Sequence, residues 1–249
     1  MKEVSVIFPA KDEEKFIAHS VKTAKKAKNV REIILVDGGS VDNTPAIAKK
    51  LGAKVIFQSI LKYPGKGVAM RDGYYYSTKD IIVFLDADIK NLTPDFINKL
   101  IEPILKGETD FVKGTFGRKS GRVTELVAKP LLRIFYPELS YLSQPLSGEI
   151  AGTSEAFSKV NWELGWGVDI GIVLDIYKAG FKIKEENLGF KDHDMKPLPM
   201  LTEMAYEVAQ TIIRRATQDG KISESKGEEL LAKYIEESKT QKYEEDEEM

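Results

Sequence analysis

Short apolar runs alternate with amphipathic stretches through the first half of the chain. The runs are too short for helices and carry few polar positions, which indicates strands that are buried on both faces. They occupy residues 4–8, 32–36, 54–57 and 81–85. Apolar positions three and four residues apart predict amphipathic helices between and after them. These helices are expected at residues 11–28, 44–51, 68–77 and 94–105. The alternation indicates βαβ units, so the predicted fold class is α/β with a mostly parallel sheet flanked by helices.

The pattern changes after residue 110, where helices become more frequent than strands. Strands are predicted at residues 110–113, within 140–152 and at 182–188, and helices at 122–135, 167–178, 202–217 and 223–239. No linker separates two domains. We expect residues 1–113 and 114–239 to be two halves of one domain, followed by a disordered acidic tail at 240–249.

Composition excludes several classes of protein. The net charge is −2, which gives no overall attraction to nucleic acid. There is no cysteine, which excludes disulfides and thiolate metal sites and makes the cytoplasm the expected location. No apolar run approaches the roughly 20 residues of a membrane helix, and the first residues do not resemble a signal peptide.

The fourth apolar run ends abruptly in two carboxylates, Asp86 and Asp88, within the sequence VFLDAD. Ligands of open α/β sheets bind at the carboxyl ends of the strands. Two acids this close repel each other, and a hard divalent cation that also binds phosphate oxygens relieves the repulsion. The pair therefore predicts a Mg²⁺ or Mn²⁺ site that holds a diphosphate. The alternative is a loop whose acids only cap the next helix.

Two other strand ends and one loop fit the same ligand. Pro9, Ala10 and Glu13 follow the first strand, Asp37 ends the second, and Lys66 lies in a Gly-Lys-Gly loop. In a parallel sheet these groups share one edge, where they could hold a nucleotide, with Lys66 near phosphate. Each has a simpler alternative: a first-turn acid at Glu13, a glycine turn at Asp37 and an exposed loop lysine at Lys66.

Two common nucleotide-binding folds do not fit the chain. A Rossmann domain needs G-x-G-x-x-G after its first strand, but the chain has PAKDE there. A P-loop motif is also absent. A sugar nucleotidyltransferase would need a glycine-rich loop with arginine at the same place.

The sequence resembles GT-A glycosyltransferases in VSVIFPAKDEE, ILVDGGSVDNT and VFLDAD. The second half resembles the glucosyl-3-phosphoglycerate synthase family in GRVTEL, QPLSGE, GWGVDIG and the NLG that precedes His193. This resemblance implies a metal-dependent, retaining transfer of glucose from a nucleoside diphosphate sugar such as UDP-glucose to 3-phosphoglycerate, a small anionic acceptor. Residues 1–113 would then bind the nucleotide sugar, and residues 114–239 would bind the acceptor.

The resemblance also implies roles for individual residues. Those implied at the nucleotide are Pro9, Ala10, Glu13, Asp37, Lys66 and Asp86. The metal would be bound by Asp88 and His193, next to Asp86. The sugar would be bound by Gly148, Glu149 and Asp169, and catalysis would involve Asp86, Asp88, Glu149 and Asp169. The acceptor would be bound by Arg118, Gly121, Arg122, Thr124 and Lys191.

Elementary chemistry supports some of these roles. Imidazole is a common ligand of transition metals, and His193 lies in a loop between two aspartates. Arg118, Lys119 and Arg122 make a basic, glycine-rich loop that suits a phosphate, although a solvated basic loop is the alternative. The chain departs from the family pattern at Asp169, Lys191 and Met195, where Glu, Arg and Asn are usual, and this affects the acceptor most.

Other functions share the first half of this pattern. A polyprenyl-phosphate sugar transferase would have the same nucleotide site and would favour a membrane contact, for example through the helix at 202–217. Core packing or a homodimer contact are the alternatives for that helix. A non-catalytic nucleotide-sugar binder is a third possibility. An inverting enzyme would need a carboxylate base, for which Asp169 and Glu149 are the candidates.

Overall fold

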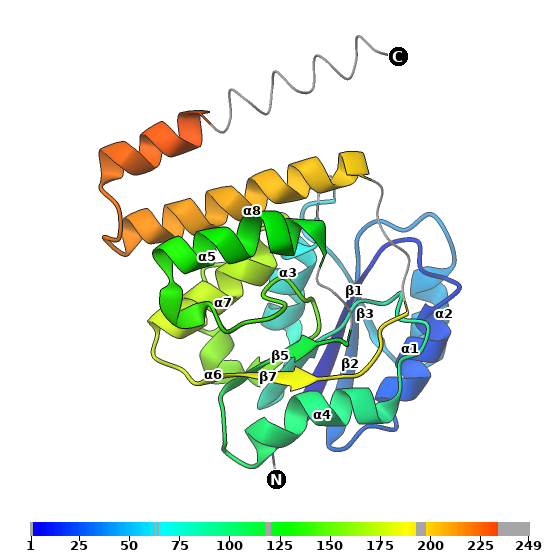
Figure 1. Cartoon of the computed structure of the whole chain (residues 1–249). Helices are drawn as coiled ribbons and strands as arrows, with labels where there is room; N and C mark the ends of the chain where they lie inside the picture. The colour runs from blue at the N-terminus through cyan, green and yellow to red at the C-terminus, as the bar shows by residue number, and fades with distance from the viewer. Residues whose placement is uncertain (1, 62, 64, 118–120, 193–197, 234–249) are drawn as a thin grey trace.

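The structure is a computed structural model, and it describes residues 2–61, 63, 65–117, 121–192 and 198–233. Its centre is a seven-stranded sheet with the order β3-β2-β1-β4-β6-β5-β7 (Figure 1). The strands are β1 Val4–Ala10, β2 Val30–Asp37, β3 Lys54–Phe57, β4 Ile81–Phe84, β5 Phe111–Thr115, β6 Ile150–Thr153 and β7 Ile183–Asn187.

Most strand pairs are parallel, as the sequence predicts. Strand β1 pairs in parallel with β2 and β4, β2 with β3, and β5 with β7. Strand β6 lies between β4 and β5 and runs antiparallel to both. The prediction of an α/β fold with a mostly parallel sheet is confirmed. The expected boundary after residue 113 falls inside β5, so one sheet joins the two halves.

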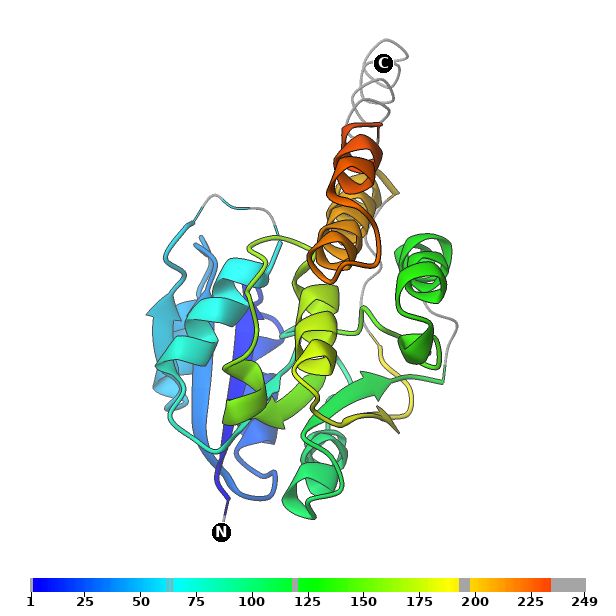
Figure 2. The same cartoon turned by 90° about the vertical axis from the view of Figure 1, so that its left-hand side faces the viewer.

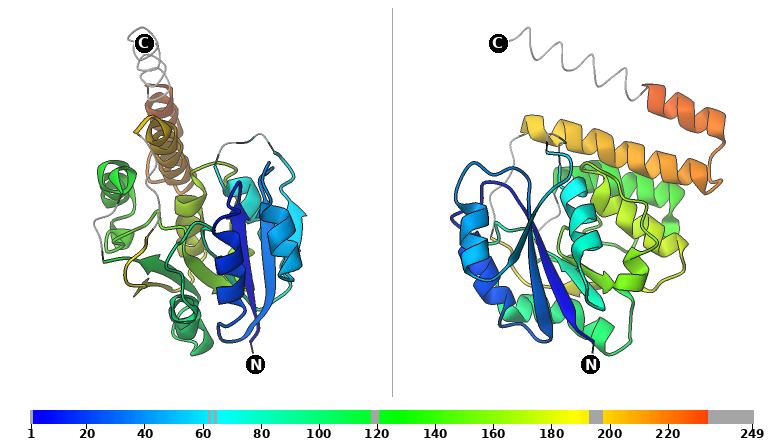
Figure 3. Two further views of the ribbon diagram at one scale, coloured as in Figure 1. Left: turned by 90° about the vertical axis from the view of Figure 1, so that its right-hand side faces the viewer. Right: turned by 180° about the vertical axis from the view of Figure 1, so that it is seen from behind.

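Helices cover both faces of the sheet (Figures 2 and 3). Side chains alternate along β1, so that Val6 and Phe8 belong to one buried core and Ile7 to the other. Helices α1 and α4 pack on the first core, and α3, α5, α7 and α8 on the second. These helices, with α2, are α1 Ile17–Ala24, α2 Thr44–Lys50, α3 Gly67–Tyr76, α4 Pro94–Leu105, α5 Lys129–Phe135, α7 Val168–Lys178 and α8 Leu198–Gln218.

Several helix boundaries differ from the pattern-based expectation. Helix α1, Ile17–Ala24, is shorter than residues 11–28, and at the expected start Asp12, at φ 56°, has a left-handed backbone that a helix does not accept. The helix predicted at 122–135 is divided into a π-helix, η1 Thr124–Ala128, and α5. Pro130 lacks a backbone donor, which fits the change of hydrogen-bonding pattern there. The short helices η2 Pro137–Leu139 and α6 Ser154–Phe157 were not predicted.

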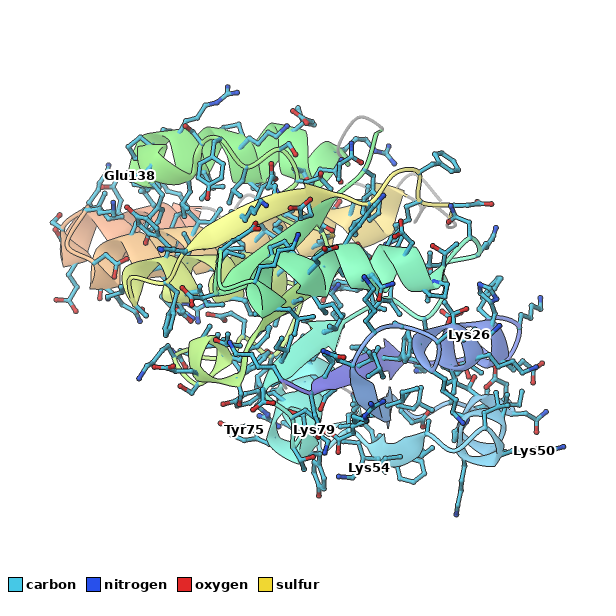
Figure 4. All side chains as sticks on the ribbon, turned by 90° about the horizontal axis from the view of Figure 1, so that it is seen from below. Lys26, Lys50, Lys54, Tyr75, Lys79 and Glu138 are labelled. Carbon is cyan, nitrogen blue, oxygen red and sulfur yellow. The ribbon has the colours of Figure 1, made fainter. Side chains whose placement is uncertain are left out.

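The outer surface carries most of the lysines. Lys26, Lys50 and Lys54 are exposed, and Figure 4 shows them at the periphery of the molecule near α1, α2 and β3. In the described part of the chain, no helix is both long and apolar enough to cross a membrane. The lysines discussed below differ from these surface lysines because they lie inside the molecule.

Candidate active site

A cavity of about 670 Å³ opens at the carboxyl edge of strands β1 to β4. Its walls come from parts of the chain that are far apart in sequence. The strand ends and the loop before α3 contribute Pro9, Ala10, Glu13, Gly38, Lys66, Asp86 and Asp88. The second half contributes Gly121, Arg122, Thr124, Gly148, Glu149, Asp169 and Lys191. The strand-end residues and the second-half residues therefore meet in one site.

The strand-end wall comprises Pro9, Ala10, Glu13, Gly38, Asp86 and Asp88. It forms where neighbouring parallel strands end at the same edge of the sheet. Ala10 of β1 is paired with Asp37 of β2, so the two strands end at the same level. The N–H of Gly38 then donates to the carbonyl oxygen of Ala10 at 2.8 Å, which extends the pairing by one residue. Asp86 and Asp88 follow β4 on the other side of β1. The wall therefore combines backbone at β1 and β2 with carboxylates after β4.

The wall carries an excess of negative charge. Burial, together with the neighbouring charges of Asp88, Asp42 and Asp86, raises the pKa of Glu13 to about 7. A carboxyl whose pKa is raised by other carboxylates marks a place where a cation would be favourable. Oxygen ligands of this kind suit Mg²⁺ and Mn²⁺. The residues present therefore fit a divalent metal.

Asp37, which was predicted at the nucleotide, is the last residue of β2. Its side chain is buried and does not line the cavity. One carboxylate oxygen accepts the N–H groups of Gly39 and Ser40, both at 3.1 Å, and the other accepts the hydroxyl of Ser40 at 2.5 Å. Asp37 therefore shapes the turn after β2, and Gly38 is the residue of that turn that faces the cavity.

The floor of the cavity is a network of paired charges. Lys66 Nζ lies 3.3 Å from Asp86 Oδ1 and 3.2 Å from Asp169 Oδ2. Lys191 Nζ lies 2.8 Å from Asp86 Oδ2 and 2.5 Å from Glu149 Oε1. We call these five residues the charged floor. Asp86 belongs to both regions, because it ends β4 and pairs with both lysines.

Electrostatics within the charged floor are strong because its opposite charges lie within 3.3 Å of each other. Burial alone would raise the pKa of Asp86, but the ammonium groups of Lys191 and Lys66 hold that pKa well below its usual range. Burial raises the pKa of Glu149, and Asp86 adds to the rise, although Lys191 and Lys66 oppose it. The pKa of each lysine is raised by the carboxylates despite burial. The charged floor is therefore held together by internal ion pairs.

Glycines allow the floor to close. A Cβ on Gly148 would lie 2.2 Å from Lys66 Nζ and 2.9 Å from Asp86 Oδ1. Gly65 and Gly67, on either side of Lys66, pack against the backbone of residues 163–166, where a Cβ on Gly67 would lie 2.2 Å from the Glu163 carbonyl oxygen. The Gly-Lys-Gly loop is thus fixed by close backbone packing, and this places Lys66 on the floor.

The opposite side of the cavity is basic and more open. Gly121 and Arg122 are exposed, and Thr124 is buried at the start of η1. Arg118 and Lys119 lie outside the described residues, as does His193. Among the described residues, no group of three or more His, Cys, Asp or Glu side chains is placed to hold a metal ion.

Comparison with known proteins decides the family. The glycosyl transferase family 2 model matches residues 5–164. The chain belongs to glycosyl transferase family 2. It is therefore a glycosyltransferase, as the sequence predicts.

Its relatives carry a more specific name. The chain is 38% identical over 244 residues to glucosyl-3-phosphoglycerate synthase of Petrotoga mobilis, covering 88% of this chain and 75% of the relative. It is 38% identical over 233 residues to the synthase of that name from Mycolicibacterium smegmatis, covering 85% and 77%. The expected resemblance to the glucosyl-3-phosphoglycerate synthase family is confirmed.

Solved structures support the same fold. The structure of glucosyl-3-phosphoglycerate synthase from Mycobacterium tuberculosis in complex with Mn²⁺, uridine diphosphate and glucosyl-3-phosphoglycerate matches with a TM-score of 0.80 and 36% identity, over 86% of this chain and 80% of that one. A complex of the same protein with Mn²⁺, UDP-glucose and phosphoglyceric acid matches with a TM-score of 0.79 and 35% identity, over the same shares. The predicted GT-A type fold is confirmed.

Sequence reasoning missed several residues of this glycosyltransferase site. Gln58 and Met204 line the cavity but belong to no motif, and Trp166 lines it from within GWGVDIG, where it had been given no role. Lys191 was predicted at the acceptor, but it lies in the charged floor with only 5% of its side chain exposed. In the sequence, the glycines on either side of Lys66 indicated close packing. They did not show that this loop packs against residues 163–166.

Proposed function

We propose that this glycosyltransferase transfers glucose from UDP-glucose to 3-phosphoglycerate with retention of the anomeric configuration and with Mg²⁺ or Mn²⁺ bound. The observation that carries the proposal is the composition of one cavity. It has an acidic strand-end wall, a charged floor and a basic opening at Arg122. Similar proteins of known structure hold Mn²⁺, UDP-glucose and phosphoglyceric acid, which are ligands that these three parts would suit.

The nucleotide would lie along the strand ends. Pro9, Ala10 and Gly38 offer backbone and small side chains to the uridine, and Glu13 offers a carboxylate. Asp37 would act indirectly, because it fixes the turn that presents Gly38. Lys66 would face the diphosphate from the floor, where its charge offsets the negative charge of the leaving group.

The metal would be held by Asp88 with His193, next to Asp86. When bound, the divalent ion supplies a Lewis acid that neutralises charge on the diphosphate. The negative potential that raises the pKa of Glu13 supports a cation at this place. Asp86 is already paired with Lys66 and Lys191, so in our proposal Asp88 is the more direct ligand.

The sugar would lie above the charged floor. Gly148 leaves the space, and the carboxylates of Glu149 and Asp169 would accept hydrogen bonds from sugar hydroxyls. Both carboxylates are oriented beforehand, because Lys191 holds Glu149 and Lys66 holds Asp169. Such preorganisation favours a defined sugar conformation.

The acceptor would enter through the basic opening. Gly121, Arg122 and Thr124 would contact the phosphate or carboxylate of 3-phosphoglycerate, together with Arg118 in the adjoining segment. The guanidinium of Arg122 matches a phosphate or carboxylate with two parallel hydrogen bonds. Lys191 would act from below, through Glu149, and not on the acceptor directly.

In the reaction, the bond between the anomeric carbon and the diphosphate oxygen breaks, and a bond to the acceptor hydroxyl oxygen forms on the same face of the sugar. The transition state has oxocarbenium character, as in glycoside hydrolysis. The leaving phosphate oxygen takes the proton of the acceptor hydroxyl, so no carboxylate base is required. An inverting reaction would need Asp169 or Glu149 as a base, but both are engaged by lysines.

A cytoplasmic location and a homodimeric assembly are also part of the proposal. The lack of cysteine supports a reducing compartment. A homodimer formed through the C-terminal helices would be tested by light scattering.

Release of UDP tests the proposed function. The chain is incubated with UDP-glucose and Mn²⁺, and with 3-phosphoglycerate, a polyprenyl phosphate or no acceptor. The proposal expects UDP release that depends on both the metal and 3-phosphoglycerate. Release only with the polyprenyl phosphate would move the function to a lipid acceptor. Donor binding without release for any acceptor would indicate a non-catalytic binder.

A further inference from the structure

One lysine inside the molecule has no part in the proposed reaction. Lys113 lies in the middle of β5 and its exposed fraction is 0%. On this strand it shares a side of the sheet with Phe111, which belongs to the core under α7 and α8. Lys113 does not line the cavity. It differs from the exposed lysines Lys26, Lys50 and Lys54 of Figure 4, which lie at the periphery of the molecule.

The surroundings of Lys113 are charged. Its Nζ lies 3.4 Å from the backbone carbonyl oxygen of Asp169, in the first turn of α7. Three carboxylates and one lysine face it. They are Asp169 on α7, Glu149 before β6, Glu185 on β7 and Lys66 before α3. Within the described residues, no carboxylate oxygen comes within ion-pair distance of Lys113.

A buried position is unfavourable for a charged lysine unless nearby groups stabilise the ammonium. Burial lowers the pKa of Lys113 to about 8, and the charge of Lys66 lowers it too, while Asp169 and Glu149 oppose the shift. Below that pH the ammonium is retained in the interior. A buried charge is tolerated where opposite charges surround it.

Asp169 connects this lysine to the cavity. One of its carboxylate oxygens, Oδ2, faces Lys66 at 3.2 Å. The other, Oδ1, is buried and has no hydrogen-bond partner among the described residues. Lys66 therefore holds the side chain of Asp169 from the cavity, and Lys113 holds its backbone from below. The next residue along β5, Gly114, donates its N–H to the carbonyl oxygen of Glu149 at 2.8 Å, so β5 positions both sugar-facing carboxylates.

The balance of charges in the floor also supports a role for Lys113. The charged floor has three carboxylates, Asp86, Glu149 and Asp169, and two lysines, Lys66 and Lys191. Lys113 supplies the third positive charge. Without it, one net negative charge would remain among these clustered side chains, and the ion pairs would have to rearrange.

We propose that Lys113 is a positioning residue for the sugar end of the donor site. It acts through Asp169, by fixing the first turn of α7 and by balancing the charge of the floor from beneath. This inference rests on the proposed use of a nucleotide sugar. It predicts that Lys113 matters for the sugar and not for the nucleotide, because it lies under Asp169 and away from the strand ends.

The test compares two ligands in one protein. Lys113→Met keeps most of the side-chain length and removes the charge, and Lys113→Arg keeps the charge. Lys54→Met, on the exposed edge strand β3, is the matched control. Affinities for UDP and for UDP-glucose are measured by calorimetry with Mn²⁺, and the unfolding midpoint is measured for every variant.

We expect Lys113→Met to bind UDP within twofold of the wild type, and to lose about tenfold or more in affinity for UDP-glucose and in kcat. Lys113→Arg should recover part of the loss, and Lys54→Met should match the wild type. Equal losses for UDP and UDP-glucose, or no loss for either, would overturn the inference. A wild type that binds no UDP-glucose would instead defeat the proposed function.

A measurement on the wild type covers the case in which both variants fail to fold. The ratio of UDP-glucose affinity to UDP affinity is followed from pH 7 to pH 9. Loss of the Lys113 proton near pH 8 should lower this ratio. A ratio that stays constant to pH 9 would contradict the role of the charge.

Discussion

The strand-end wall and the charged floor meet at Asp86 but are built in opposite ways. The wall is made of short contiguous segments after β1, β2 and β4, and burial together with its clustered acids raises the pKa of Glu13. The floor gathers residues 66, 86, 149, 169 and 191, and its charges are paired within the protein. The clustered carboxylates of the wall suit a cation, while the floor is organised by its own ion pairs. Variants should affect the two regions differently.

The largest effect is expected on the wall. Asp88→Ala should lower kcat by about a hundredfold or more, because the carboxylate that we propose as a metal ligand is lost. The unfolding midpoint without metal should change little, since Asp88 lies among other acids at the cavity and not in the hydrophobic core. Turnover is measured over a series of Mn²⁺ concentrations. Unchanged kcat at saturating donor and acceptor would refute the metal role of Asp88.

The next effect is expected on the floor. Gly148→Ala should displace Lys66 and lower UDP-glucose affinity about tenfold or more, because the added Cβ would lie 2.2 Å from Lys66 Nζ. Overpacking of this kind also lowers the free energy of unfolding, by about 1–3 kcal/mol. Gly117→Ala is the control, as its Cβ would meet nothing nearer than 4.0 Å. Wild-type affinity in Gly148→Ala would show that the floor is not tightly packed around Lys66.

The basic opening belongs to neither region, and its variant should separate the two substrates. Arg122→Ala should raise the KM for 3-phosphoglycerate about tenfold, through loss of charged hydrogen bonds, and leave the KM for UDP-glucose within twofold. Arg133→Ala, on the exposed side of α5, is the control. A similar rise in both KM values would argue against a contact between Arg122 and the acceptor.

The smallest effect concerns pH. The pKa of Glu13 is about 7 in the folded protein against 4.5 as its ordinary value, so the folded state binds more protons than the unfolded state between these values. Without divalent metal, stability should therefore fall as pH rises from 4.5 to 7. Glu13→Gln cannot lose a proton and should lack this fall.

Differential scanning fluorimetry at pH 5 and pH 8 measures this difference. Added Mn²⁺ should offset part of the loss at pH 8 in the wild type. The same change in unfolding midpoint between pH 5 and pH 8 for Glu13→Gln and the wild type would contradict the raised pKa of Glu13. It would also contradict the excess negative charge of the wall.

The difference between the strand-end wall and the charged floor also explains how much of the site the sequence could predict. The βαβ alternation and the acids after β4 lie in short segments, and the residues predicted there, Pro9, Ala10, Glu13, Asp86 and Asp88, line the cavity. Asp37 was the exception, because a carboxylate before two glycines and a serine can close its own turn. The sequence pattern alone does not distinguish a carboxylate that binds a nucleotide from one that closes its own turn.

The floor and the second half were harder to predict. Strand β6 lies between β4 and β5, although it follows both in the chain, and nothing in its four residues indicates that position. Lys191 and Lys113 become informative only when distant segments are brought together. Their burial depends on Glu149 and Asp169, which no local periodicity connects to them. The domain halves and the roles of the site residues remain predictions for the experiments above.

The central claim is most directly tested by NMR of the protein with UDP-glucose and Mg²⁺, with and without 3-phosphoglycerate. The account predicts a new α-anomeric signal that appears only when both the acceptor and the metal are present. A product with a β-anomeric signal would contradict retention. Failure to form any product from 3-phosphoglycerate, with UDP-glucose bound, would contradict the proposed acceptor.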